Sequence, residues 1–326
     1  MTRLGIGLIG VGKHGSRYAR HIVRELPDIR LVALARRNFD LGRQQANEFG
    51  CRAYADYRDL MAAPDIDAVI VVVPPTLHRE IIETAAVLRR PVLLEKPAAV
   101  TVAEGRRMLH AVRVSGIPVM VAQTLRYNGV VRLLLKEQAS IGHLHSLRIS
   151  QRFEPSRPAW IDDPAVAGGG MIIQTGVHSF DLMRVLSGLE AERVSCEMSG
   201  IRTERTEDNF TAVIRLSDGI TLASIAGSRA TASRSGPIEL AGEEGQLIAD
   251  HLLNTASMLR GTTITPLPVP PPVATVGKVV ADFASALERG VPMPIPLEEG
   301  LRAVAIAQAC YEAAGSGHAV SVAAIS

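Results

Sequence analysis

The stretch that decides the fold is Leu4-Gly5-Ile6-Gly7-Leu8-Ile9-Gly10-Val11-Gly12-Lys13-His14-Gly15, near the start of the 326-residue sequence. A short, mostly apolar run leads directly into three glycines spaced as GxGxxG, and a segment of helical periodicity follows. Strand, glycine-rich turn and helix in this order are typical of a dinucleotide-binding βαβ unit. Gly10 permits the tight turn, Gly12 lets the backbone approach a pyrophosphate, and Gly15 allows close packing of helix on strand. The sequence therefore predicts a dinucleotide at the positive end of this helix.

Cationic side chains lie beside this motif and after the second predicted strand. We expect Lys13 and His14 to border the phosphates. About twenty residues further on, an NAD site carries an acidic residue that accepts hydrogen bonds from the ribose, but this chain has Ala35-Arg36-Arg37-Asn38 there. A guanidinium cannot accept a hydrogen bond, whereas it pairs bidentately with a 2′-phosphate. Arg36 and Arg37 therefore favour NADP, with NAD as the alternative if both are solvated loop residues.

Up to residue 122, short β-branched runs alternate with segments of helical periodicity. This pattern predicts a doubly wound parallel sheet covered on both faces, which binds ligands beyond the carboxyl ends of its strands. The predicted strands are residues 4–9, 30–35, 51–53, 68–73, 91–94 and 118–122. The predicted helices are residues 13–25, 41–49, 77–88 and 102–115.

From residue 123 the pattern changes to consecutive strands separated by turns. Predicted strands cover residues 144–153, 194–201, 210–216, 220–228, 238–241 and 247–250. Predicted helices cover residues 130–138, 171–186, 276–289 and 297–314. The sequence thus predicts two domains: a Rossmann domain over residues 1–122 that binds NAD(P), and an α+β domain over residues 123–326. Strands without intervening helices predict an antiparallel sheet in the second domain.

Composition and charge exclude several classes of function. The chain is 47% hydrophobic and 21% charged, as in soluble globular proteins, and 35 basic residues against 33 acidic residues leave no charge cluster for nucleic acid. No apolar run approaches the roughly 20 residues of a membrane span, and no cleavage site follows the N-terminal run, so we expect a cytoplasmic protein. The three cysteines are widely separated, and His143 and His145 lack a third ligand at suitable spacing, so no metal is expected.

Glu95-Lys96-Pro97 follows the predicted strand at residues 91–94, at the edge where substrate and nicotinamide should meet. Lysine is scarce in this chain and occurs at positions 13, 96, 136 and 278. Arginine cannot release a proton near neutral pH, whereas a lysine here can polarise a carbonyl oxygen as hydride moves. Lys96 is therefore a candidate catalytic residue.

Together these motifs resemble the Gfo/Idh/MocA oxidoreductase family. The other matching stretches are Asp67-Ala68-Val69-Ile70, Pro74-Pro75-Thr76-Leu77-His78, Gly168-Gly169-Gly170 leading to His178-x-x-Asp181, Glu207-Asp208-Asn209, Gly242-Glu243-Glu244-Gly245 and Asp282-Phe283. The resemblance implies a Rossmann domain with bound NAD(P) and a second domain, over residues 123–326, with an open, mostly antiparallel sheet. That second domain forms the substrate pocket and a dimer or tetramer interface. It also implies that the substrate is a sugar, a cyclitol or a related cyclic alcohol or ketone.

The resemblance implies that Lys96 is catalytic and that His178 acts as acid and base. Four residues before this histidine the family usually has an aspartate, but this chain has Gln174. An amide cannot take a proton, so Gln174 can only orient the substrate or fix the tautomer of His178. The proton transfer then falls on His178 with Lys96 assisting. Asp181 either holds the imidazole or caps a local network.

Other residues complete the predicted sites. Pro74, His78 and Glu95 are expected on the cofactor side, although a structural role for His78 is equally consistent with the sequence. Arg126 is expected to bind substrate or to bridge the domains. Trp160 is expected to stack on a sugar face, with core packing as the alternative.

Two classes of function fit these observations. The first is an NADP-dependent dehydrogenase or reductase of sugars or cyclitols, with a glycosidase that retains its NAD as an enzymatic alternative. The second is a regulatory protein of the same fold that senses NAD(P) without catalysis, which the glutamine at position 174 keeps open.

Overall fold

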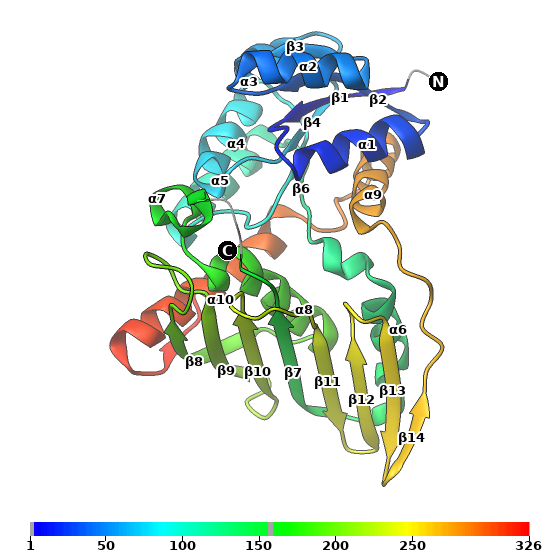
Figure 1. The fold of residues 1–326 in the computed structure, drawn as a ribbon, viewed down its shortest axis with the longest axis vertical. Coiled ribbons are helices and arrows are strands. Elements are labelled where there is room, and N and C mark those ends of the chain that lie inside the picture. The colour runs from blue at the N-terminus through cyan, green and yellow to red at the C-terminus, as the bar shows by residue number, and fades with distance from the viewer. Residues whose placement is uncertain (1–2, 156–158, 326) are drawn as a thin grey trace. The chain divides into compact units, whose positions relative to one another are not determined.

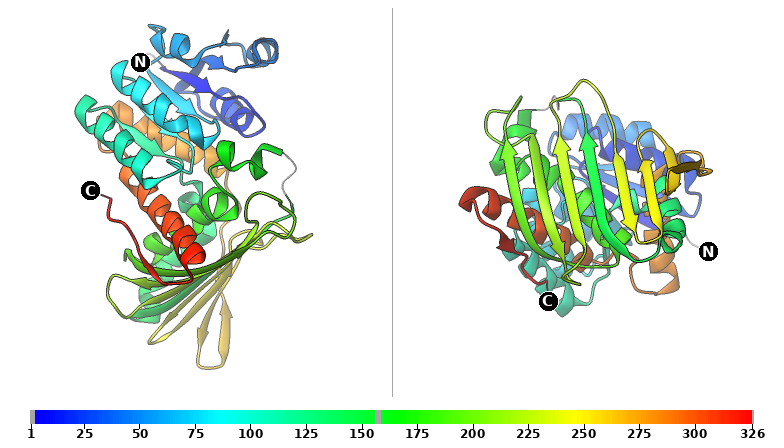
Figure 2. Two further views of the ribbon diagram at one scale, coloured as in Figure 1. Left: turned by 90° about the vertical axis from the view of Figure 1, so that its left-hand side faces the viewer. Right: turned by 90° about the horizontal axis from the view of Figure 1, so that it is seen from below.

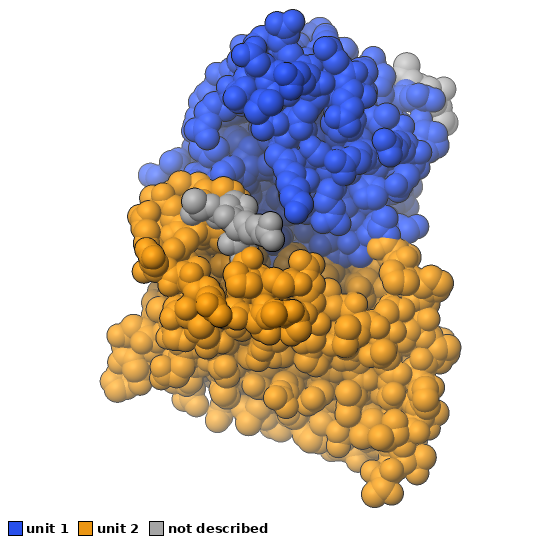
Figure 3. Space-filling view, in the orientation of Figure 1, with its two compact units in different colours: residues 1–99, 103–124, 274–301 blue, residues 100–102, 125–273, 302–326 orange. Residues whose placement is uncertain are grey.

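The computed structural model describes residues 3–155 and 159–325, which form two compact units coloured separately in Figure 3. Unit 1 comprises Met1–Ala99, Ala103–Thr124 and Ala274–Leu301, and unit 2 comprises Val100–Val102, Leu125–Val273 and Arg302–Ser326. The sequence places one boundary between residues 122 and 123, whereas in the structure the segment 274–301 packs with unit 1. A hydrogen bond of 2.8 Å from Val121 N to Ile295 O joins this segment to the end of the sheet in unit 1.

Unit 1 contains a six-stranded parallel sheet with the order β3-β2-β1-β4-β5-β6 and helices on both faces (Figures 1 and 2). The strands are β1 (Leu4–Ile9), β2 (Ile29–Ala35), β3 (Arg52–Tyr54), β4 (Ala68–Val71), β5 (Val92–Leu94) and β6 (Val119–Val121). The helices are α1 (Gly15–Glu25), η1 (Pro75–Leu77), α2 (Phe39–Phe49), α3 (Tyr57–Ala62), α4 (His78–Val87), α5 (Val102–Ser115) and α9 (Thr275–Arg289). This arrangement confirms the predicted Rossmann sheet.

The central strands of this sheet form because their residues are apolar on both faces. All four residues of β4 and all three of β5 are fully buried, as expected where helices cover a parallel sheet on both sides. The pairing of β1 with β4 joins Ile9 to Val71, and the pairing of β5 with β6 joins Leu94 to Val121. The carboxyl ends of these strands therefore lie along one edge.

Unit 2 contains a nine-stranded sheet with the order β14-β13-β12-β11-β7-β10-β9-β8-β15. The strands are β7 (Leu144–Arg152), β8 (Ala191–Ser199), β9 (Asn209–Leu216), β10 (Leu222–Ser228), β11 (Pro237–Gly242), β12 (Gly245–Asp250), β13 (Thr255–Arg260), β14 (Thr263–Pro266) and β15 (Val320–Ser321). Every neighbouring pair is antiparallel except β7 and β10, which are parallel. The predicted, mostly antiparallel sheet is confirmed.

The helices of unit 2 cover one face of its sheet and leave the other face free of helices (Figure 2, right). They are η2 (Thr124–Tyr127), α6 (Gly129–Glu137), η3 (Gln138–Ile141), η4 (Ala159–Asp162), α7 (Pro164–Ala167), η5 (Ile172–Gly176), α8 (Val177–Ser187) and α10 (Leu297–Ser316), with the first turns of η2 and α10 beginning in unit 1. The predicted helix 171–186 is interrupted because η5 is a π-helical turn. Within the described ranges, no helix is long and apolar enough to cross a membrane.

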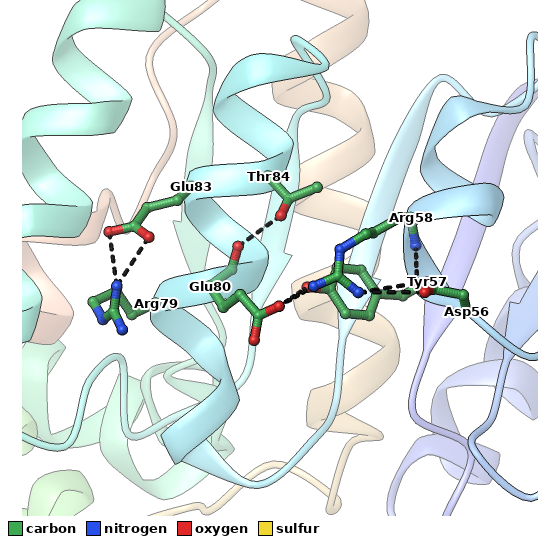
Figure 4. A network of polar contacts seen from close by, with 7 residues as sticks. All are labelled: Asp56, Tyr57, Arg58, Arg79, Glu80, Glu83 and Thr84. Carbon is green, nitrogen blue, oxygen red and sulfur yellow. Dashed lines mark hydrogen bonds and ion pairs between the residues drawn. The ribbon is translucent and has the colours of Figure 1, made fainter.

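A polar network joins α3 and α4 on the surface of unit 1 (Figure 4). Arg58 contacts both Asp56 and Glu80, and the hydroxyl of Tyr57 donates to Glu80 Oε1 at 2.9 Å. The Arg58 side chain is 50% exposed, and its two carboxylate partners are exposed to a similar degree. Exposed ion pairs contribute little to stability, so this network is not expected to set the position of the site.

Candidate active site

The glycine-rich turn after β1 has the geometry that a dinucleotide requires. Gly10 has a φ of +89°, and a Cβ added there would lie 2.2 Å from Val72 O. A Cβ on Gly15 would lie 2.0 Å from Gly10 O, whereas a Cβ on Gly12 would meet no atom within 4 Å. Gly10 and Gly15 are therefore required by the packing of the turn. Gly12 leaves open space beside the backbone, which fits the close approach of a pyrophosphate.

The start of α1 directly follows this turn. The helix begins at Gly15, no side chain caps it, and its first turn has no acidic residue. Uncapped amides at a helix N-terminus attract anions. Lys13 and His14 are both exposed beside them, so the residues present fit a dinucleotide phosphate.

Glu95 is a buried carboxylate that links α1 to the end of β5. Its Oε1 accepts hydrogen bonds from His14 Nε2 at 2.6 Å and from the Tyr18 hydroxyl at 2.5 Å, and its Oε2 accepts from Lys96 N at 3.0 Å. Burial by itself raises the pKa of Glu95, but the hydrogen bond and charge of His14, the charge of Lys96 and the Tyr18 hydroxyl outweigh it and lower the pKa to about 2. Glu95 is therefore ionised at neutral pH and fixes the backbone at Lys96.

His78 stabilises the same segment from the opposite side. Its ring is fully buried, with Nδ1 2.9 Å from Pro97 O and Nε2 3.2 Å from Val73 O. Burial lowers the pKa of His78, although both carbonyl contacts act in the opposite direction. From the sequence, His78 is either a cofactor contact or a structural residue; in the structure its ring lies buried against the carbonyls of Val73 and Pro97. Pro74, at the start of η1, is half-buried.

Lys96 lies just beyond the carboxyl end of β5 and is half-buried. The bond from Glu95 holds its amide, and the bond from His78 holds the carbonyl of Pro97, which follows it. The peptide between Lys96 and Pro97 is cis. The backbone on both sides of this lysine is thus fixed by buried partners.

Arg36 lies beside the glycine-rich turn rather than extending into solvent. Its Nη1 donates to Val11 O at 3.2 Å and to Gln45 Oε1 at 2.6 Å, and Gln45 Nε2 donates to Ser16 Oγ at 3.2 Å. Both bonds of Arg36 leave from Nη1, so its Nε and Nη2 donors can still face a ligand. Arg37 is exposed.

In unit 2, Gln174 is held by its surroundings more tightly than the sequence analysis anticipates. Its Nε2 donates to Ile161 O at 2.9 Å and to Gly169 O at 2.5 Å, and its Oε1 accepts from Arg229 Nη1 at 2.5 Å. Both N–H bonds of the amide are therefore used on backbone carbonyls. Gln174 fixes the loop before it, while His178 lies half-buried in the first turn of α8.

Arg229 is a functional candidate that sequence reasoning missed. It follows β10, is 6% exposed, and lies in no recognisable motif. Burial lowers the pKa of Arg229, while the nearby carboxylates of Glu207, Asp208 and Asp162 raise it. Its backbone N–H donates to Asp208 O at 2.8 Å. In the sequence, only the glutamine at position 174 pointed to an unusual contact here, and nothing in the sequence identified Arg229 as its partner.

Glu207 anchors the glycine triplet. Its carboxylate accepts hydrogen bonds from Gly170 N at 3.1 Å, Ile172 N at 2.8 Å and the Tyr311 hydroxyl at 2.8 Å. A Cβ on Gly170 would lie 1.8 Å from Glu207 O, so only glycine fits this approach. Burial raises the pKa of Glu207 despite these donors. The acidic residue thus holds the π-helical turn that leads into α8.

Arg126 and Asp181 form a buried bidentate pair in unit 2. Arg126 Nε donates to Asp181 Oδ2 at 2.8 Å, and its Nη2 donates to Oδ1 at 2.6 Å. The aspartate side chain is 1% exposed. This buried carboxylate therefore fixes the orientation of the Arg126 guanidinium. Trp160 in η4 is 44% exposed, which leaves its ring accessible and excludes full core packing.

An NAD(P)-binding Rossmann unit followed by an α+β unit with an open sheet defines a two-domain oxidoreductase. A family model described as "Oxidoreductase family, NAD-binding Rossmann fold" matches residues 4–123, and one described as "GFO/IDH/MocA C-terminal domain" matches residues 132–248. The chain therefore belongs to the Gfo/Idh/MocA family and is an NAD(P)-dependent oxidoreductase. The resemblance stated from the motifs is confirmed.

Two curated relatives have low sequence identity to this chain but match most of its length. Myo-inositol 2-dehydrogenase of Thermotoga maritima is 27% identical over 78% of this chain and 77% of its own length. The 1,5-anhydro-D-fructose reductase of Ensifer adhaerens is 27% identical over 97% of this chain and 98% of its own. A levoglucosan dehydrogenase solved with NADH and L-sorbose has a TM-score of 0.89 at 24% identity, covering 100% of both chains. That structural similarity supports the fold.

Proposed function

We propose that this protein transfers hydride between the C4 atom of NADP and a carbon of a sugar, a cyclitol or a related cyclic alcohol or ketone. Three observations support the substrate class: relatives named for inositol, for anhydrofructose and for levoglucosan all act on small polyhydroxylated rings. The exposed Trp160 offers a flat apolar face of the kind that packs against sugar C–H bonds. The oxidised substrate is then a ketone or a lactone.

The preference for NADP over NAD rests on Arg36. Two nitrogens of its guanidinium, Nε and Nη2, are not used by Val11 or Gln45, and they have the fork geometry that pairs with a 2′-phosphate. No carboxylate occupies the end of β2, where the ribose hydroxyls of NAD would find an acceptor. The glycine-rich turn and the start of α1 would hold the pyrophosphate.

In this proposal His178 transfers the proton and Lys96 stabilises the reacting oxygen. The nicotinamide, when bound, exchanges hydride with the substrate carbon. In the oxidative direction the substrate hydroxyl must lose a proton, and His178 accepts it as the general base. The Lys96 ammonium stabilises the developing negative charge on that oxygen. In the reductive direction both groups act in reverse.

The observation that carries the proposal is the fixed backbone around Lys96, and Lys96→Met tests it. We expect turnover to fall by about 10²- to 10⁴-fold, because the variant cannot polarise the substrate oxygen. The dissociation constant of NADPH should change by less than about twofold. Stopped-flow hydride transfer and nicotinamide fluorescence measure the two quantities. Lys136→Met, on the exposed surface of α6, is the control, and wild-type turnover in Lys96→Met would overturn the assignment.

A second function, cofactor sensing without catalysis, is favoured by one observation. The family's carboxylate position holds Gln174, whose amide is fully engaged and cannot accept a proton. A sensor would bind NADPH and NADH but would not oxidise or reduce any polyol or ketone. Net conversion of the cofactor in the presence of a substrate would exclude it.

We also propose that the helix-free face of the nine-stranded sheet meets a second copy of the chain, giving a homodimer or a homotetramer. Val213, Leu222 and Ile248 lie on strands of this sheet and are 52%, 46% and 37% exposed. Arg148 and Glu239 pair directly across β7 and β11 between them. The exposed face thus carries apolar side chains and one residue of each charge. Such a patch can pair with a second copy of itself across a two-fold axis. Light scattering after size-exclusion chromatography measures the assembly.

A further inference from the structure

Gln123 is a buried side chain whose acceptor is not used by the protein. The residue is 1% exposed and stands two positions after the end of β6. Its Oε1 atom is buried, and no donor within residues 3–155 and 159–325 hydrogen-bonds to it. Leaving a buried amide oxygen unsatisfied costs free energy comparable to a lost hydrogen bond. A ligand that brings a hydrogen-bond donor to this oxygen would remove that cost.

The position of Gln123 in unit 1 is set by the pairing of β5 with β6. Leu94 pairs with Val121, and Ala122 N donates to Leu94 O at 2.8 Å. The segments that follow the two strands therefore leave the sheet side by side, one carrying Lys96 and the other Gln123. Beyond the carboxyl ends of such strands a parallel sheet binds its ligand.

The main chain at Gln123 is fixed by two short-range bonds. Gln123 N donates to Val121 O at 2.9 Å, and Thr124 N donates to Ala122 O at 2.9 Å. Only the side chain can adjust, and the torsion that carries its terminal amide is broad. Rotation of that amide lets Oε1 turn toward a ligand while the residue stays in place.

We propose that Gln123 Oε1 accepts a hydrogen bond from the carboxamide N–H group of the nicotinamide and so orients the ring for hydride transfer. This assignment rests on the proposed function. A primary amide suits the site because it offers a donor to Oε1 and an acceptor to the glutamine N–H group. A substrate hydroxyl is the other donor that could reach this edge, and the experiment separates the two.

The test measures binding, without turnover, by isothermal titration of the wild-type chain and of Gln123→Met. Methionine has nearly the length of glutamine and lacks the amide. The probes are NADP and its 3-acetylpyridine analogue, in which a methyl group replaces the carboxamide N–H donor. Gln308→Met is the matched control, because the Gln308 amide already has its own partners, Val102 N and Glu312 Oε1.

We expect wild-type protein to bind NADP about tenfold more tightly than the analogue. Gln123→Met should bind both dinucleotides with the weaker affinity, and Gln308→Met should keep the wild-type ratio. The melting temperature of ligand-free Gln123→Met should equal or exceed that of wild type, since an unsatisfied oxygen is removed. An unchanged ratio in Gln123→Met overturns the proposal. If a separate turnover assay of that variant then shows a raised KM for the sugar substrate, the oxygen is assigned to the substrate instead. Absence of NADP binding to wild type would instead overturn the proposed function.

Discussion

At the scale of single residues, Glu95 joins two parts of the candidate site. The sequence analysis expects Glu95 on the cofactor side, and the structure shows it turned toward His14 and Tyr18 of the neighbouring helix. One buried carboxylate thus binds the start of α1 to the backbone at Lys96. Its contribution to stability should depend on pH.

Glu95→Gln is predicted to lower the free energy of unfolding at neutral pH by about 3 kcal/mol, because a neutral amide replaces a buried carboxylate whose ionised form is stabilised by His14, Lys96 and Tyr18. Since the pKa of Glu95 is lowered from 4.5 to about 2, its stabilisation is complete above about pH 4.5 and is lost as the pH falls toward 2. The difference between wild type and variant in urea unfolding should therefore shrink across that range. Glu25→Gln, which removes a surface partner of His21, should cost less than about 0.5 kcal/mol at any pH. A pH-independent loss in Glu95→Gln would contradict this account.

Arg36 determines the choice of cofactor in this proposal. Arg36→Asp should raise the dissociation constant of NADPH by about 10- to 100-fold, because an aspartate repels the 2′-phosphate. The dissociation constant of NADH should stay the same or fall, because the aspartate accepts hydrogen bonds from the ribose hydroxyls. Arg37→Asp adds the same charge at an exposed neighbour and should have a much smaller effect. Fluorescence titration measures both, and equal effects of the two variants would show that only net charge matters.

The site of unit 2 shows what single-residue reasoning from sequence could and could not reach. His178 and Gln174 were found because their spacing follows a family motif. Arg229 was missed because it meets Gln174 across 55 residues of sequence, and no local pattern records such a contact. Asp181 was assigned alternatives that the sequence could not separate, and its bond to Arg126 also depends on the tertiary fold.

At the scale of elements, the turn between β1 and α1 separates the demands of folding from those of binding. Gly15→Ala places a Cβ 2.0 Å from Gly10 O and should destabilise the chain by about 2 kcal/mol or more. Gly12→Ala meets no neighbour within 4 Å and should change stability by less than about 0.5 kcal/mol. It should nevertheless weaken NADPH binding by at least about tenfold, because its methyl group occupies the space needed by the pyrophosphate. Thermal melts and titrations of the two variants test this, and normal NADPH affinity in Gly12→Ala would contradict it.

Elements with a clear local pattern were predictable from the sequence. β1 has the predicted bounds, and most strands of unit 1 differ by a few residues at their ends. Short elements, such as α3 and β15, were not predicted because few residues carry too little periodicity. The π-helical turn before α8 was also not predictable, since it depends on Glu207 holding Gly170 and Ile172 from a distant strand connection.

At the scale of the whole molecule, the sequence predicted two domains and the correct class of each sheet. It did not predict that the segment 274–301 belongs to unit 1. The amphipathic pattern of α9 shows that one face of the helix is buried, but it does not show which sheet covers that face. The parallel pairing of β7 with β10 was likewise invisible to patterns that run along one strand. Long-range pairing, rather than local propensity, accounts for these differences.

The chain is an NAD(P)-dependent oxidoreductase, and we propose that it prefers NADP. Titration of the purified wild-type protein with NADPH and NADH, followed by nicotinamide fluorescence, tests it most directly. The account predicts saturable binding of both, with NADPH at least about tenfold tighter. Equal affinities would contradict the role of Arg36, and the absence of saturable binding by either dinucleotide would contradict the account as a whole.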